Sequence, residues 1–321
     1  MKTLPKIDWE RVDALIRMAL DEDLGGRGDT TTISVIGEDL VVDAVFLAKE
    51  DCVCAGLCVA ERLMKTVDPK IEWKSVVNEG DFCPKGTIMA KLHGPARSLL
   101  TGERTALNFV QRLCGVATAA HKYQQAAGDK CAILDTRKTT PGYRNLEKYA
   151  VAVGGASNHR IGLYDRIMIK DNHRELAGLG GTGGILRSVA NARKLYPDLE
   201  VEVEIDSLAE LPEALESKAE YILLDNMSTA DMAEAVRMTA HRAKLEASGN
   251  MTLARIPEVA ATGVDFISSG ALTAYITPSA TAAVPICMGA GGYDVKSLFK
   301  MGWSFAVLAC VVYVTFVSLV Y

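Results

Sequence analysis

The sequence predicts an α/β protein whose second half is a parallel β-sheet or a barrel. Short apolar runs of strand length recur between residues 131 and 268, and most stretches between them are long enough for a helix. Six consecutive runs also end in charged, Ser or Gly residues. Because the carboxyl ends of barrel strands share one face, where active sites form, we expect these ends to surround one site.

The six predicted strands cover residues 131–135, 166–170, 201–205, 221–225, 244–248 and 264–268. Their ends would bring together Arg137, Lys170, Glu204, Asp225, Ser248 and Gly270.

The first part of the chain is a mixture of helix and strand. Apolar residues at helical spacing predict a helix over 7–20, and two β-rich runs at 44–48 and 88–92 are separated by turn signals. A longer helical stretch, roughly 95–125, leads into the second part. We therefore expect one domain over 1–112 and a second over 113–273.

Composition sets broad limits on function. The chain has 321 residues, is 49% hydrophobic and carries a formal net charge of -5, which gives no global reason to expect nucleic acid or an anionic membrane as partner. Eight cysteines without a cleavable apolar N-terminus fit a cytoplasmic location. The closest cysteines, Cys52, Cys54 and Cys58, lack the paired spacing of a zinc site.

One window reverses the overall charge. Residues 137–174 contain eight Lys or Arg and three acids, a local net charge of +5. Arg137, Lys138 and Lys170 directly follow strands, and several converging cations favour a ligand with more than one negative group. The alternative is a solvated surface, and for Arg144 the two interpretations stand equal.

Two strand ends carry acids, Glu204 and Asp225. Beside an anion site they could hold Mg²⁺ that bridges to pyrophosphate, or steady a cationic transition state. The alternative is that Arg137 or Lys170 neutralises them.

Two glycine-containing loops, 248–250 and 268–271, follow strands and precede helix-like stretches, where backbone N–H groups can hold a phosphate. The glycine-rich run 178–184 matches no nucleotide-binding motif and is interpreted as a connector.

The last twenty residues, 302–321, contain no charge and have the length of a transmembrane helix. A buried core helix is the alternative, but such a helix normally shows a polar stripe.

Seven segments together resemble the quinolinate phosphoribosyltransferase family, the decarboxylating enzymes that make nicotinate mononucleotide for NAD synthesis. They are ALDEDLGGRGDTTT (19–32), TGERTALNFVQRLCGVAT (101–118), the 39-residue block beginning DTRKTTPGYRNLEK (135–173), VEVEI (201–205), LLDN (223–226), LEASGN (245–250) and ISSGALT (267–273). They occur in the family's order across about 273 residues.

The resemblance implies an incomplete, six- to seven-stranded TIM-like barrel with an N-terminal open α/β sandwich domain. It implies a homodimer, or a hexamer of dimers, in which Arg104 reaches the partner's site. Arg137, His159, Arg160 and Lys170 would hold the two carboxylates of quinolinate, and Thr136 would also bind substrate. Lys138, Glu204 and Asp225 would be catalytic and face the ribose and Mg²⁺-pyrophosphate of phosphoribosyl pyrophosphate, with no organic cofactor. The 5′-phosphate would lie against Ser248, Gly249, Asn250, Ser269, Gly270 and Ala271.

The resemblance stops after residue 273. Alanine occupies position 274, where the family usually has histidine, and residues 274–321 resemble the last segment of a divalent-anion:sodium symporter. We therefore expect a fusion of unrelated segments, with membrane contact through this tail alone. Two other functions stay open: a related phosphoribosyltransferase with another substrate, and an inactive or membrane-tethered chimera.

Overall fold

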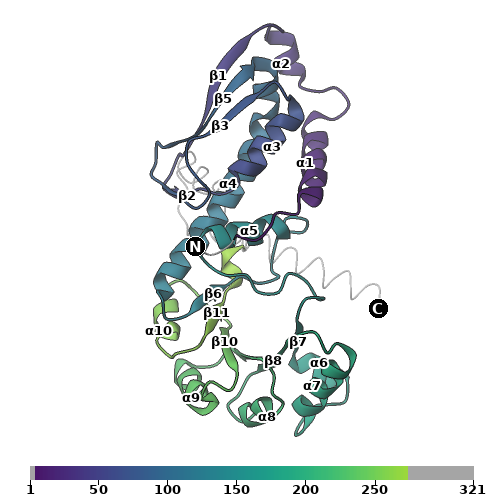
Figure 1. The fold of residues 1–321 in the computed structure, drawn as a ribbon, viewed down its shortest axis with the longest axis vertical. Helices are drawn as coiled ribbons and strands as arrows, with labels where there is room; N and C mark the ends of the chain where they lie inside the picture. The colour runs from purple at the N-terminus through teal and green to yellow at the C-terminus, as the bar shows by residue number, and fades with distance from the viewer. Residues whose placement is uncertain (1–3, 274–321) are drawn as a thin grey trace, which may run out of the picture.

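The structure, a computed structural model, describes residues 4–273. An N-terminal part of strands and helices lies against a C-terminal open barrel (Figure 1). The predicted apolar helix 302–321 and Ala274 lie outside the described residues. Within residues 4–273 no helix has both the length and the apolar character needed to cross a bilayer.

The N-terminal part is built from four helices, a small antiparallel sheet and a strand pair within the described residues. Its elements are α1 (Trp9–Leu24), α2 (Thr30–Val35), β1 (Val41–Leu47), β2 (Cys52–Val53), α3 (Leu57–Val67), β3 (Glu72–Ser75), β4 (Phe82–Cys83), β5 (Ile88–Pro95) and α4 (Ala96–Ala127). The sheet has the order β1-β5-β3 and β2 pairs with β4. Strand β5 contains the predicted run 88–92, and β1 covers the run 44–48 except for Ala48. Helix α1 begins two residues later than expected because the carboxylate of Asp8 accepts a hydrogen bond from the Arg11 amide as its N-cap.

The C-terminal part alternates strands with helices or short turns. Its elements are β6 (Ala132–Leu134), α5 (Arg144–Val153), β7 (Ile167–Ile169), α6 (Asp171–Leu176), α7 (Gly184–Leu195), β8 (Val201–Ile205), α8 (Leu211–Glu216), β9 (Tyr221–Asp225), α9 (Thr229–Thr239), β10 (Lys244–Ser248), α10 (Ile256–Ala260), β11 (Phe266–Ser268) and a 3-10 turn at Gly270–Leu272.

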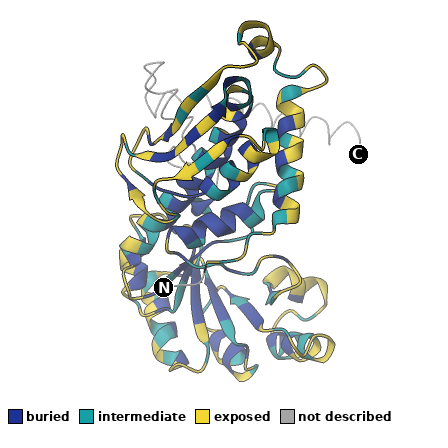
Figure 2. Cartoon of the chain, turned by 45° about the horizontal axis from the view of Figure 1, so that its top comes forward, coloured by how far each residue is buried: buried dark blue, intermediate teal, exposed yellow. Residues whose placement is uncertain are grey.

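All six predicted barrel strands are confirmed. They form one parallel sheet in the order β6-β11-β10-β9-β8-β7, with β6 and β7 as its edges. The sheet therefore curves into a barrel that stays open between these two strands, as the family resemblance implies. Figure 2 shows the strands as a buried fan with partly exposed helices outside it, so the core lies between sheet and helices.

Helix α4 joins the two parts. Its buried residues include Phe109, Leu113 and Ala117, and it packs against both α3 and α5. The contact with the end of α5 requires glycine, because a Cβ at Gly154 would lie 2.2 Å from the carbonyl oxygen of Ala117. The expected domain boundary at residue 112 falls inside this helix. Both parts therefore share one helix.

Candidate active site

A cavity of about 990 Å³ lies at the carboxyl ends of the barrel strands. Its lining includes every predicted binding or catalytic residue except Arg104: Thr136, Arg137, Lys138, His159, Arg160, Lys170, Glu204, Asp225, Ser248, Gly249, Asn250, Ser269, Gly270 and Ala271. Residues spread over 136 positions of sequence thus meet in one site. The shared direction of the parallel strands explains this convergence.

Arg137 and Arg160 form a cationic wall of the cavity. The Nε atom of Arg137 is buried and has no hydrogen-bond partner in the described part of the chain. Arg160 is held by the carbonyl of Arg166, 3.1 Å from its Nη1, while burial and the charge of Arg137 lower the pKa of Arg160. Two guanidinium groups that share a partly buried wall, with no ion pair to a carboxylate among residues 4–273, favour a bound anion.

Lys170 and Glu204 form an ion pair at the cavity. In this structure Lys170 therefore neutralises Glu204, which is the arrangement that the alternative interpretation of the acids expects. Asp225 differs, because its Oδ2 accepts a hydrogen bond from the Asn226 side-chain amide at 2.8 Å and it pairs with no Lys or Arg among residues 4–273. Lys170 is 41% exposed and can exchange this carboxylate for one on a ligand.

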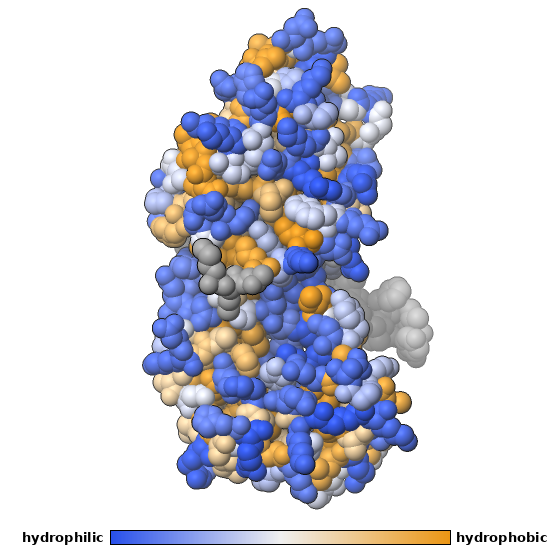
Figure 3. Space-filling model, in the orientation of Figure 1, coloured by the Kyte–Doolittle hydropathy of each residue, from blue (hydrophilic) through white to orange (hydrophobic). Residues whose placement is uncertain are grey.

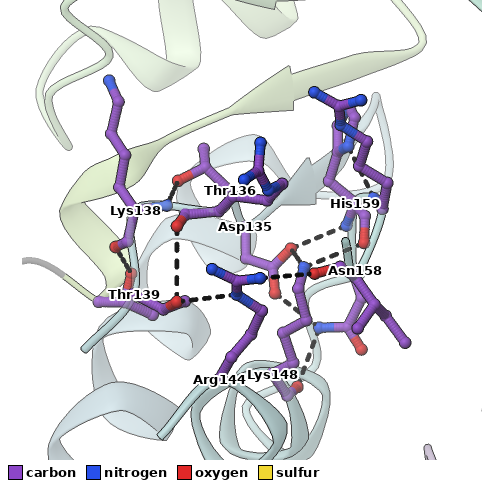
Figure 4. Close-up of polar contacts among 12 residues, drawn as sticks. Asp135, Thr136, Lys138, Thr139, Arg144, Lys148, Asn158 and His159 are labelled. Atoms are coloured by element: carbon purple, nitrogen blue, oxygen red, sulfur yellow. Dashed lines mark hydrogen bonds and ion pairs between the residues drawn. The ribbon is translucent and has the colours of Figure 1, made fainter. Parts of the chain in front are cut away.

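A buried ion pair fixes the loops that carry the two arginines (Figure 4). Asp135 directly follows β6, and its Oδ1 accepts hydrogen bonds from Lys148 Nζ at 2.6 Å and the His159 amide at 2.8 Å. Its Oδ2 accepts a third from Asn158 at 2.8 Å. Burial raises the pKa of Asp135 and lowers that of Lys148, so each group depends on the other to stay charged.

His159 is placed differently from the prediction that it binds a substrate carboxylate. Its Nε2 lies 3.0 Å from Glu202 Oε2 and 3.3 Å from Glu246 Oε2, and its Nδ1 accepts a hydrogen bond from the Arg160 amide at 2.7 Å. Burial and the bond from the Arg160 amide to Nδ1 both oppose a second ring proton, whereas the two carboxylates favour a proton on Nε2 and raise the pKa of His159. The Arg160 amide limits where a proton can sit, because Nδ1 must keep its lone pair to accept this bond.

The two predicted phosphate loops lie together at the cavity. Gly249 has a φ of +91°, and a Cβ there would lie 2.1 Å from Asn226 Oδ1, so this position requires glycine. The Lys138 stem reaches the second loop, since a Cβ at Gly270 would be 2.9 Å from its Cδ. The expected helix N-terminus is not adjacent: α10 begins six residues after Asn250, and Gly270 starts a three-residue turn.

Three sequence features lie outside the cavity lining. Arg104 is exposed on α4. Arg144 contacts Thr139 Oγ1 at 3.1 Å and the Ile161 carbonyl at 3.2 Å, so it supports two loops, as Figure 4 shows in part. The glycine-rich run ends at the start of α7, where the carboxylate of Glu213 accepts hydrogen bonds from the amides of Gly183, Ile185 and Leu186.

Sequence reasoning missed several lining residues. They are Tyr123, Met168, Leu223, Asn226, Glu246, Met251 and Thr252. Glu246 and the adjacent Glu202 are 1% and 0% exposed. The alternation of VEVEI was a usable signal for Glu202, because residues two apart on a strand point to the same face and Glu204 was already assigned to the site.

Comparisons with known proteins agree with this geometry. The model of the quinolinate phosphoribosyl transferase N-terminal domain matches residues 29–114, and that of the C-terminal domain matches 116–280. A probable nicotinate-nucleotide pyrophosphorylase (carboxylating) of Synechocystis is 44% identical over 268 residues, 82% of this chain and 88% of the relative. A chloroplastic nicotinate-nucleotide pyrophosphorylase (carboxylating) of Arabidopsis thaliana is 40% identical over 281 residues, 81% of this chain and 78% of the relative.

Among solved structures, the nicotinate-nucleotide pyrophosphorylase of Francisella tularensis matches with a TM-score of 0.79 and 38% identity, covering 86% of this chain and 96% of that one. Two matched domains in sequence order and relatives of this identity leave a single conclusion: the chain belongs to the quinolinate phosphoribosyl transferase family.

Proposed function

We propose that this protein transfers the phosphoribosyl group of phosphoribosyl pyrophosphate to quinolinate and releases CO₂, giving nicotinate mononucleotide and pyrophosphate. It is thus a pentosyltransferase of NAD biosynthesis. The observation that carries this proposal is one cavity that is lined both by a cationic wall and by two small-residue loops. The wall suits a dicarboxylate, and the loops suit a phosphate.

The quinolinate half of the site comes from the cationic wall. Arg137 and Arg160 face one or both carboxylates, with Lys170 completing the set once it leaves Glu204. Thr136 borders the same wall. Arg104, which is exposed on its own chain, contributes to the site of the partner in a homodimer. Such homodimers can further assemble into a hexamer of dimers.

The donor half comes from Lys138, the acids and the two loops. Lys138 faces the pyrophosphate and ribose, and Ser248 to Asn250 with Ser269 to Ala271 hold the 5′-phosphate. Glu204 and Asp225 offer the oxygen ligands that Mg²⁺ prefers, and Asp225 has no competing cation among the described residues. When bound with pyrophosphate, Mg²⁺ would neutralise the charge of this leaving group.

Positioning and charge account for the chemistry. As the bond between ribose and pyrophosphate breaks, the ribose becomes cationic, and Glu204 and Asp225 stabilise it electrostatically. The pyridine nitrogen, held by the carboxylate contacts, attacks this carbon. When the adjacent carboxylate leaves as CO₂, the electron pair of the broken bond stays on the ring carbon, where the quaternary nitrogen stabilises it without an organic cofactor. A proton from water then takes the place of the carboxylate.

The test is release of CO₂ from quinolinate labelled in the carboxylate next to the ring nitrogen. We expect release with phosphoribosyl pyrophosphate and none without it, together with an equal amount of nicotinate mononucleotide. Transfer to nicotinate with no CO₂ release would instead show a phosphoribosyltransferase with another substrate, and no product from any pyridine would show an inactive chain.

We further propose that residues 274–321 are foreign to the catalytic body, whose location is cytoplasmic. The family match ends at residue 280, seven residues into this segment, and leaves 281–321 unmatched. The six cysteines of the described part are all free, as in a reducing compartment. Replacing 274–321 with a family-like end should raise the soluble yield and abolish any partition into membranes. Equal yield of the two forms would contradict the foreign origin of this segment, which resembles a symporter end.

A further inference from the structure

Beneath the cationic wall lies a buried cluster of Glu202, His159 and Glu246, which the mechanism above does not use. The three residues are 0%, 7% and 1% exposed. The four carboxylate oxygens have no well-oriented hydrogen-bond donor within residues 4–273. Burial of two carboxylates without hydrogen bonds costs free energy, unless a positively charged group or a hydrogen-bond donor faces them.

Two side chains from outside the pair face these carboxylates. His159 Nε2 contacts both, and Arg166 Nη1 lies 3.7 Å from Glu202 Oε2. A ring nitrogen with a bare lone pair would repel the two anions, so Nε2 carries the proton. The opposite nitrogen, Nδ1, accepts from the Arg160 amide and is therefore the unprotonated one.

Both ring nitrogens of His159 are thus occupied by the protein. Its backbone is fixed as well, because its amide donates to Asp135 and its carbonyl accepts from Lys148 Nζ at 3.0 Å. The neighbouring residue Arg160 depends on this arrangement, since its amide is bound to the ring and its guanidinium contacts Arg166 and the Met168 sulfur.

We propose that Glu202 and Glu246 are positioning residues, which orient the imidazole of His159 so that it holds the Arg160 backbone and sets the guanidinium against a substrate carboxylate. This inference rests on the proposed function and assigns His159 a role within the protein rather than a bond to quinolinate. It also explains how two buried acids can favour binding of an anion, since they act through His159 on Arg160.

Removing one acid distinguishes this proposal from a purely electrostatic effect of the acids on the bound anion. Loss of a negative charge near an anion site should tighten quinolinate binding if charge alone acts. If the acids position Arg160, Glu246→Leu should instead weaken binding, by about tenfold for loss of one charge-assisted contact. The control is Glu258→Gln, which removes one charge at an exposed position of α10 outside the cavity lining and should leave the affinity unchanged.

The experiment is calorimetric titration of the full-length protein with quinolinate and, separately, with phosphoribosyl pyrophosphate. His159→Asn keeps an acceptor at the place of Nδ1, and His159→Gln keeps a donor at the place of Nε2 but loses that acceptor. We expect quinolinate affinity to fall least for the Asn variant, further for the Gln variant, and donor affinity to stay the same for both. Equal loss of quinolinate affinity for both, with tighter binding in Glu246→Leu, would overturn the proposal.

A second measurement needs no substitution at the cluster. In protein labelled with ¹⁵N-histidine, we expect His159 at neutral pH to show a protonated Nε2 and an unprotonated Nδ1; the reverse tautomer would overturn the proposal. If the wild-type protein binds no quinolinate, the proposed function and this inference both fail. If it binds quinolinate and Glu246→Leu binds more tightly, the inference alone fails.

Discussion

At the scale of single residues, the cations of the site differ in whether they already form a hydrogen bond or an ion pair within the described part of the chain. Arg137 keeps a buried Nε without a hydrogen-bond partner in residues 4–273, whereas Lys170 is paired with Glu204. Arg137 can therefore bind a ligand without breaking an existing contact, whereas Lys170 must exchange the carboxylate of Glu204 for one on the ligand. Loss of either cation should affect the two substrates unequally.

Arg137→Ala should weaken quinolinate binding by about tenfold to a hundredfold, the cost of one charge-assisted contact, and leave phosphoribosyl pyrophosphate binding within about threefold. Lys170→Ala should do the same and in addition leave Glu204 without its cation. Separate titrations with each substrate measure both effects. Equal losses for the two substrates would contradict the assignment of these cations to the carboxylates.

Glu204→Gln should give the opposite pattern. It removes a charge that stabilises the cationic ribose, so turnover should fall by about a hundredfold, while KM for quinolinate changes by less than about threefold. Steady-state rates with each substrate varied in turn would show this split. A rise in KM for quinolinate without a change in turnover would place Glu204 in ground-state binding instead.

At the scale of elements, the apolar runs and their polar ends were sufficient to predict the parallel sheet. Strand β3 escaped prediction because its four residues, EWKS, are exposed or half-buried and show no apolar run. The cavity side chains at strand ends could be predicted because they follow recognisable strands. Glu246 and Tyr123 could not be placed in this way, since one lies within a buried strand and the other on the long helix α4.

The connection between β6 and α5 depends on the Asp135 and Lys148 pair, which is 2.6 Å long and almost wholly buried. Asp135→Asn and Lys148→Met should each lower the free energy of unfolding by about 3–5 kcal/mol, because each leaves one buried charge without its partner. The double variant should lose less than the sum of the two. Denaturant unfolding of all four proteins checks this, and additive losses would show that the pair is not coupled.

At the scale of the whole molecule, the two parts share α4, and one predicted site residue stays away from the chain's own cavity. Arg104 is exposed on that helix, as a residue lent to a second subunit would be. Neither apolar periodicity nor strand ends can reveal such a role, because it depends on contacts between chains. On the face shown in Figure 3, hydrophobic residues are distributed among hydrophilic ones.

Mixing two inactive variants tests the shared site. Arg104→Ala and Arg137→Ala are each expected to be nearly inactive, but a heterodimer of the two would contain one site with both arginines intact. Random reassociation of equal amounts should therefore restore about a quarter of wild-type activity. Activity that stays at the level of the separate variants would contradict the contribution of Arg104 to a partner.

The most direct test of the account is a crystal structure of the protein with quinolinate bound. We predict that both carboxylates lie within hydrogen-bonding distance of Arg137, Arg160 and Lys170, that Lys170 has moved away from Glu204, and that His159 keeps its contacts with Glu202, Glu246 and the Arg160 amide. Quinolinate bound elsewhere, or bound here with a carboxylate turned to solvent, would contradict the account.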